Sequence, residues 1–114
     1  MSIANNINVD QLLGTGVTAT GAGTALRGWG GRKTYSAAGY TTAGAGAATV
    51  TIEGSFDNVT WDVMGTITLT LSNTAADDAN SDSFLSSDQY PFVRANVTAL
   101  SGTGAYVRAA RGRG

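Results

Sequence analysis

Apolar and polar residues alternate with a period of two along much of this chain, and helical periodicity is almost absent. The clearest run is 48–56, in which Val50 and Ile52 share one face and polar residues occupy the other. Residues 65–72 repeat the pattern, with Ile and Leu on one face and Thr on the other. Successive side chains of a strand point to opposite faces, so this alternation predicts half-buried β-strands.

Further short runs, separated by clusters of Gly, Asn, Asp and Ser, bring the expected number of strands to about eight. They are residues 16–20, 24–29, 32–42, 59–64, 90–99 and 104–110, with 82–86 as a short edge strand. Asp57 and Asn58 tolerate left-handed backbone conformations, so we expect a tight turn there. Helix is expected at most over residues 8–13. The pattern predicts an all-β protein with a single β-sandwich, either jelly-roll or immunoglobulin-like.

The 114 residues suit one domain, which we expect to span residues 16–110 between two loosely held terminal arms. The N-terminal arm, residues 1–15, carries isolated apolar residues, and residues 111–114 form a basic tail. Both are either frayed ends or segments that become ordered against a neighbouring subunit. In the second case the interface candidates are Ile3, Ile7, Leu12, Leu13, Arg111 and Arg113.

Small residues dominate the composition, with 18 Ala, 16 Gly and 16 Thr, so the core is expected to be thin. A thin core makes stabilisation by oligomerisation plausible. The chain has neither Cys nor His, which removes disulfides, thiol nucleophiles and the usual general base. We therefore expect no enzymatic activity and no cofactor. A net charge of −1 gives no reason to expect nucleic-acid binding, and no apolar run is long enough to cross a membrane.

Oxygen ligands at alternate positions occur at Asp78, Asn80 and Asp82, a spacing that can wrap a hard cation such as calcium. The pattern of a calcium loop is incomplete, because Ser83 and Gln89 stand where Gly and Glu are required. The other interpretation is a polar surface loop with Asx turns. The three residues are candidate metal ligands on the first interpretation only.

Trp29 is the aromatic residue with the most unusual surroundings, since it lies between two glycines and close to Arg32. Trp and Arg are enriched at binding hot spots, so both are candidate interface residues. Trp29 is equally compatible with a core position. Trp61 lies within a predicted strand and is expected to pack in the core.

Three segments, residues 50–61, 65–69 and 92–102, together resemble small β-sandwich virion proteins of tailed bacteriophages. The shared features are a Ser-x-Asp hairpin followed by Trp, and a late strand ending in Arg-x-Asn-x-Thr. The likeness covers residues 48–110. It implies a capsid decoration or cement protein, or a head-to-tail or tail component, that is made in the host cytoplasm and resides on the virion. Its partners would be the major capsid protein and further copies of itself, often as a trimer. A tail carrying Arg111 and Arg113 would then meet an acidic shell surface, and binding would weaken with salt.

The same hairpin also occurs in discoidin-like carbohydrate-binding modules, which are longer and commonly have Gly where this chain has Asn58. That likeness implies the alternative function, a glycan-binding protein of the virion that uses exposed aromatic residues.

Overall fold

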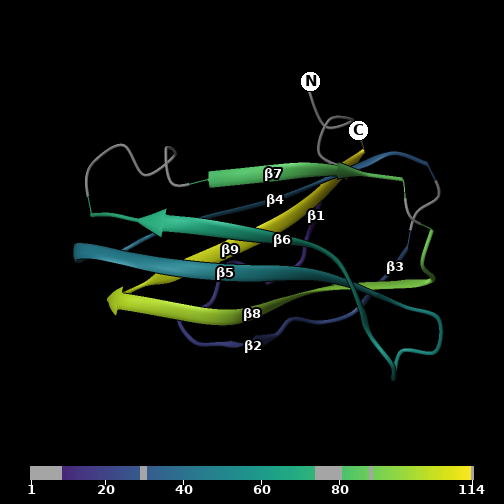
Figure 1. Ribbon diagram of the computed structural model, residues 1–114, viewed down its shortest axis with the longest axis horizontal. Coiled ribbons are helices and arrows are strands. Elements are labelled where there is room, and N and C mark those ends of the chain that lie inside the picture. The colour runs from purple at the N-terminus through teal and green to yellow at the C-terminus, as the bar shows by residue number, and fades with distance from the viewer. Residues whose placement is uncertain (1–8, 29–30, 74–80, 88, 114) are drawn as a thin grey trace.

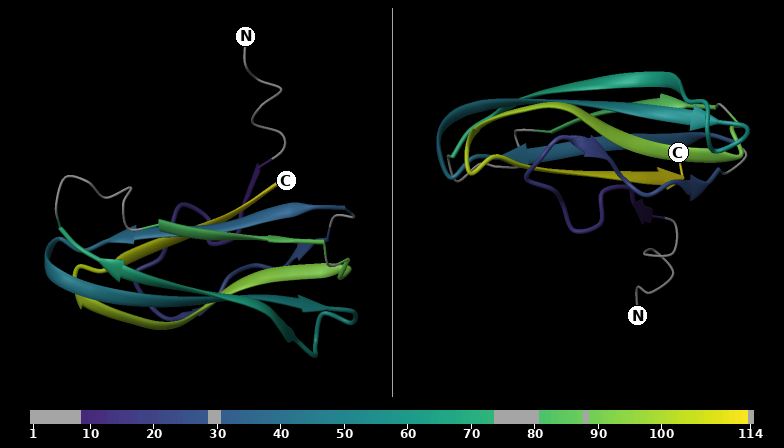
Figure 2. Two further views of the ribbon diagram at one scale, coloured as in Figure 1. Left: turned by 45° about the horizontal axis from the view of Figure 1, so that its top comes forward. Right: turned by 90° about the horizontal axis from the view of Figure 1, so that it is seen from below.

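Nine β-strands in two antiparallel sheets make up the described part of the chain in the computed structural model (Figure 1). The structure describes residues 9–28, 31–73, 81–87 and 89–113. The first sheet has the order β1 (Val9–Gln11), β9 (Tyr106–Arg113), β4 (Lys33–Tyr40) and β7 (Ser81–Ser86). The second has the order β2 (Gly21–Ala22), β8 (Phe92–Thr103), β5 (Ala43–Ser55) and β6 (Asp62–Leu71), and β3 (Leu26–Arg27) also pairs with β8. Figure 2 shows the sheets as two stacked layers.

The connectivity distinguishes between the two sandwich types that were expected. Strands β2 and β3 are two pieces that pair along the same strand, β8. With these counted as one, the chain crosses to the other sheet at every connection except the β5–β6 hairpin. An immunoglobulin-like sandwich instead pairs its first two strands within one sheet. The β-sandwich is therefore confirmed, and its topology is that of a jelly roll.

The core lies between the sheets and follows the alternation seen in the sequence. On the second sheet, Val50, Ile52, Ile67, Leu69, Leu71, Val93 and Val97 are buried. The threonines that alternate with them on β6 are exposed. On the first sheet, β4 and β9 contribute the small residues Ala37 and Ala109 together with Tyr35 and Val107. The aliphatic side chains of the second sheet thus face a mixture of alanines and larger side chains on the first.

Several predicted elements differ from the structure. Residues 59–64 are not a separate strand, because 56–61 form the connection and β6 begins at Asp62. Residues 16–20 contain only an isolated bridge from Val17 to Val107, and 24–29 reduces to the two residues of β3. Strand β1 replaces the helix considered for residues 8–13. In the part of the chain that the structure describes, no helix is long and apolar enough to span a membrane.

The terminal segments correct the expectation of loose arms. Leu12 and Leu13 are buried in the core, and the Leu12 N–H donates to the carbonyl of Ala109 at 2.9 Å. Arg111 belongs to β9 and is only 1% exposed. Backbone pairing with β9 and burial of apolar surface hold the start of the described chain to the sandwich. These three residues are therefore not available to a partner, while Ile3 and Ile7 lie outside the described residues.

Candidate interaction surface

The β5–β6 connection is a turn organised by the hydrogen bonds of two side chains, Ser55 and Asp57. The Ser55 hydroxyl donates to Asp57 Oδ1 at 3.0 Å and accepts the Asn58 N–H at 2.9 Å. The same Asp57 oxygen accepts the N–H groups of Val59 at 2.9 Å and Thr60 at 2.8 Å. Asn58 has a φ of 61°, which Asn adopts more readily than most residues. Side-chain hydrogen bonds therefore take the place of a two-residue hairpin turn.

The electrostatics of the turn follow from these bonds. Backbone N–H groups of Thr60 and Val59, with the Ser55 hydroxyl, hold the pKa of Asp57 below its ordinary value. Each donor stabilises the carboxylate form of Asp57. The turn is thus best organised when Asp57 is ionised.

Three large apolar side chains are displayed on this turn and the first residues of β6. Phe56 is 73% exposed, Val59 78% and Val63 61%. In the left view of Figure 2 the teal hairpin projects beyond the body of the sandwich. We call these three residues the hairpin tip. Exposed apolar side chains on a projecting element are available for contact with another molecule.

Tyr90 packs against Phe56 of the hairpin tip. Its ring lies 5.2 Å from the ring of Phe56, centroid to centroid, at an angle of 53°. Gly54 permits this packing, because a Cβ at that position would lie 2.3 Å from atoms of the Tyr90 ring. The tip is therefore anchored to the body by an aromatic pair, and Phe56 keeps most of its surface exposed.

A partly buried ionic cluster lies at the base of the hairpin. The Arg94 Nε donates to Glu53 Oε1 at 2.7 Å, and the Arg94 guanidinium lies 4.2 Å above the ring centroid of Trp61. Thr51 and Asn96 donate to Glu53 Oε2 at 3.0 and 3.2 Å. Burial raises the pKa of Glu53, but the hydrogen bonds from Arg94, Asn96 and Thr51 outweigh burial and lower it below its ordinary value. The cluster fixes the hairpin against β8.

A β-bulge directs the hairpin away from the sheet. Ile52 is opposite Gly65, but Glu53 is opposite Val63, so Met64 is the extra residue on β6. Bulges bend a strand and increase its twist. In Figure 1 the start of β6 crosses β5, and the hairpin turns toward the side of β8.

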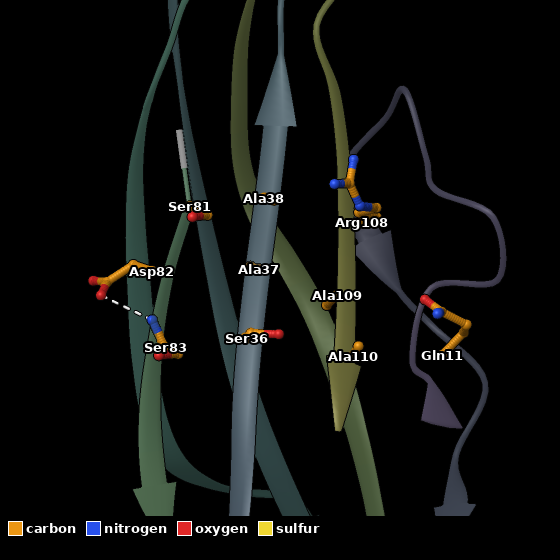
Figure 3. A pocket seen from close by; sticks show the side chains of 10 residues that line it. All are labelled: Gln11, Ser36, Ala37, Ala38, Ser81, Asp82, Ser83, Arg108, Ala109 and Ala110. Carbon is orange, nitrogen blue, oxygen red and sulfur yellow. Dashed lines mark hydrogen bonds between the residues drawn. The ribbon is translucent and has the colours of Figure 1, made fainter. Parts of the chain in front are cut away.

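A second surface feature is a shallow hollow of about 440 Å³ on the outer side of the first sheet (Figure 3). Ser36 and Ala38 of β4 and Ala110 of β9 contribute short side chains to it. Asp82 lies at one side, and Arg108 and Gln11 lie at the other. The Asp82 carboxylate accepts the N–H of Ser83 at 2.8 Å. The hollow has oppositely charged borders.

The structure describes only some of the remaining predicted site residues. Asp82 lies on β7, whereas Asp78, Asn80 and Trp29 lie outside the described residues. Among residues that the structure describes, no three Asp or Glu side chains are grouped to hold a metal ion. Arg32 is exposed, and Arg113 ends β9.

Among the described residues, Trp61 and Tyr40 are aromatic residues that are partly covered. Trp61 is half-buried rather than a core residue, with Arg94 over its ring. Tyr40 stacks on Tyr106 at 4.8 Å between ring centroids.

Comparisons with protein-family models, with curated proteins and with solved structures find no match for this chain.

Sequence reasoning missed the hairpin tip because it assigned Val59 and Val63 to a strand. A signal was present in the Ser55-x-Asp57-Asn58 pattern, since Ser, Asp and Asn side chains compete with strand pairing by binding nearby backbone N–H groups. Apolar residues that flank such a turn lie outside the alternation of the strands. They are candidates for exposure.

Proposed function

We propose that this protein is a non-enzymatic structural component of a tailed-phage virion, a decoration protein that binds the major capsid protein on the outside of the shell. Two observations support the proposal. One is the sequence resemblance of residues 48–110 to such proteins. The other, which carries the docking mechanism, is the exposed apolar hairpin tip on a turn held by side-chain hydrogen bonds.

Docking through the hairpin tip has a favourable energy source. Fully burying a Val or Phe side chain contributes about 1.5–3 kcal/mol relative to leaving it exposed. Phe56, Val59 and Val63 together therefore supply several kcal/mol, against an association cost of roughly 4–15 kcal/mol. The hydrogen bonds of Ser55 and Asp57 order the turn before binding, which lowers that cost.

The proposed contact with the shell is apolar, whereas the sequence alone predicts an electrostatic contact through the basic tail. Arg111 is buried in the sandwich, so it does not meet an acidic shell surface. An apolar contact is less sensitive to salt than an exposed ion pair. We therefore expect binding to shells to change little between low and high salt.

Co-sedimentation with shells assembled without this protein tests the proposal. The full chain should pellet at a stoichiometry matched to the capsid repeat, and the double variant Phe56→Ser with Val59→Ser should stay in the supernatant. Leu85→Ser is the matched control, because Leu85 is 58% exposed on β7 and away from the hairpin. Equal losses in both variants would contradict docking through the tip. If the unchanged protein does not bind shells, the decoration role is wrong. Binding to tails or to a glycan array would then indicate a tail or glycan-binding role instead.

A further inference from the structure

The outer face of the first sheet carries three hydrogen-bond donors around one short side chain, Ala110. Gln11 of β1 and Ser36 of β4 are each directly opposite Ala110, one on either side of β9. Arg108 lies two residues before Ala110 on β9 itself. Opposite residues and residues two apart share a face of the sheet, and the buried Ala109 between them assigns these four to the outer face. An amide, a hydroxyl and a guanidinium therefore surround the Ala110 methyl group.

The space above Ala110 is part of the hollow of about 440 Å³ (Figure 3). Its volume is within the range of roughly 300–1,000 Å³ that is usual for small-molecule sites. Gln11 and Arg108 are exposed, and Ser36 is half-buried. Within the described residues, these three side chains take part in no ion pair or hydrogen bond. They are thus available to a molecule that enters the hollow.

The donors around Ala110 fit a carboxylate. The Arg108 guanidinium has N–H donors in a planar fork that matches the two oxygens of a carboxylate, and the Gln11 amide and Ser36 hydroxyl add further donors. Hydrogen bonds to an ionised group are roughly twice as strong as those between neutral groups. The short side chain of Ala110 leaves the space that the carboxylate would occupy.

The other end of the hollow has different chemistry. Ala38 of β4 and Ser83 of β7 line it, and Asp82 lies at its border. Strands β7 and β9 are the two neighbours of β4, so the ends of the hollow are two strand spacings, roughly 10 Å, apart. Asp82 would repel a second anionic group, whereas a hydroxyl group of a ligand can donate to a carboxylate. The described lining residues include no aromatic or large aliphatic side chain, so an apolar ligand does not fit.

We propose that this hollow binds a hexuronic acid unit of an acidic polysaccharide. The sugar carboxylate lies above Ala110 and accepts hydrogen bonds from the three donors around it, while the ring hydroxyls face Ser83 and Asp82. An acidic side chain of a protein partner would match the donors but leave the rest of the hollow unfilled, so a sugar acid is the better match. Because Arg108 is exposed, we expect a dissociation constant on the order of 1 mM.

This site is separate from the surface proposed to bind the capsid. The hollow lies on the outer side of the first sheet, whereas the hairpin tip belongs to the β5–β6 connection of the second sheet. A sugar in the hollow therefore does not compete with docking through the tip. The inference does not rest on the capsid role, and it adds a glycan-binding function to this chain.

NMR titration of the ¹⁵N-labelled full chain tests the site. The probes are D-glucuronic acid and D-galacturonic acid, with D-glucose as the ring without the carboxylate and acetate as the carboxylate without the ring. At least one uronic acid should shift the backbone amide signals of Gln11, Ser36 and Ala110. Glucose and acetate should each bind about tenfold more weakly, because each lacks one half of the contacts.

Two pairs of variants check the assignment of residues. Arg108→Met should raise the dissociation constant for the uronic acid about tenfold, because it removes the charge-assisted hydrogen bonds. Arg27→Met is the matched control, since Arg27 is exposed on β3 and the same charge is lost. Ala110→Leu fills the space for the carboxylate and should abolish binding, whereas Ala99→Leu, exposed on β8, should not. Amide signals away from the hollow should stay in place in all four variants, which verifies that each is folded.

Several results would overturn the proposal. They are equal binding of glucose or acetate, equal losses in the two arginine variants, and shifts that map to another surface. Binding of a polyglutamate peptide, with no binding of either uronic acid, would replace the sugar by an acidic protein partner. No shells are used, so failure here is distinguishable from failure of the proposed capsid role.

Discussion

Replacement of Arg111 by Met should destabilise the protein by about 3 kcal/mol. The guanidinium is buried, and it donates to Asp10 Oδ2 at 2.5 Å and to the carbonyl of Arg27 at 2.9 Å. These bonds tie β9 to β1 and β3. Each hydrogen bond to a charged group contributes about 1.5–3 kcal/mol, and the low end applies because Asp10 is a third exposed and regains water.

Urea unfolding of the full chain, followed by circular dichroism, measures the effect. Arg108→Met is the matched control, since Arg108 is exposed on the same strand. We expect the control to change the free energy of unfolding by no more than about 0.5 kcal/mol. In a thermal scan the Arg111 variant should lose roughly 10–15 °C in Tm.

The reasoning would be refuted if both variants had the same stability as the unchanged protein. Arg111 would then be exposed, and the basic tail expected from the sequence would be available to a partner. The salt dependence of stability further distinguishes a buried Arg111 from an exposed one. About 0.5 M NaCl should leave the difference between the variants nearly unchanged, because buried ion pairs are screened much less than exposed ones.

Three further predictions concern β5. Ile52→Ala should lower the free energy of unfolding in urea by about 2–5 kcal/mol, because it removes buried methyl groups. Thr66→Ala on the exposed face of β6 should lower it by less than about 0.5 kcal/mol, and equal losses would contradict the assignment of faces. Gly54→Ala should cost about 1–3 kcal/mol, since the new Cβ meets the Tyr90 ring, and a Tyr90→Ala background should relieve most of this cost. Because folding lowers the pKa of Glu53, its carboxylate stabilises the fold above its ordinary value of 4.5 and loses this effect as the pH falls through the folded value. Glu53→Gln should therefore be less stable at neutral pH, with a flatter dependence on acid; an unchanged slope would argue against the cluster.

The sandwich could be predicted from the sequence because its central strands follow a local rule. The alternation around Val50, Ile67 and Val93 assigned the buried faces correctly, since one face of each strand is in the core. Strands β2 and β3 could not be predicted from alternation. Their two residues each are defined by pairing with β8 and not by a pattern of their own.

Burial of Arg111 had no local signal at all. Its carboxylate partner, Asp10, is 101 residues away in the sequence and becomes adjacent only when β1 pairs with β9. Arginine near a chain end is usually exposed, so composition favours a solvated tail. The candidate surface was missed for a related reason, because Phe56 and Val59 are exposed by side-chain hydrogen bonds of the turn and not by strand alternation.

A single irregularity sets the direction of the hairpin tip. The bulge at Met64 ends the regular part of β6, so Val63 belongs to the projecting hairpin, whereas Gly65–Leu71 stays in regular register with β5. Bulges bend a strand, so without the extra residue the hairpin would continue the plane of the sheet. With the bulge, the exposed side chains of Phe56, Val59 and Val63 belong to a part of the chain that projects beyond the sandwich (Figure 2).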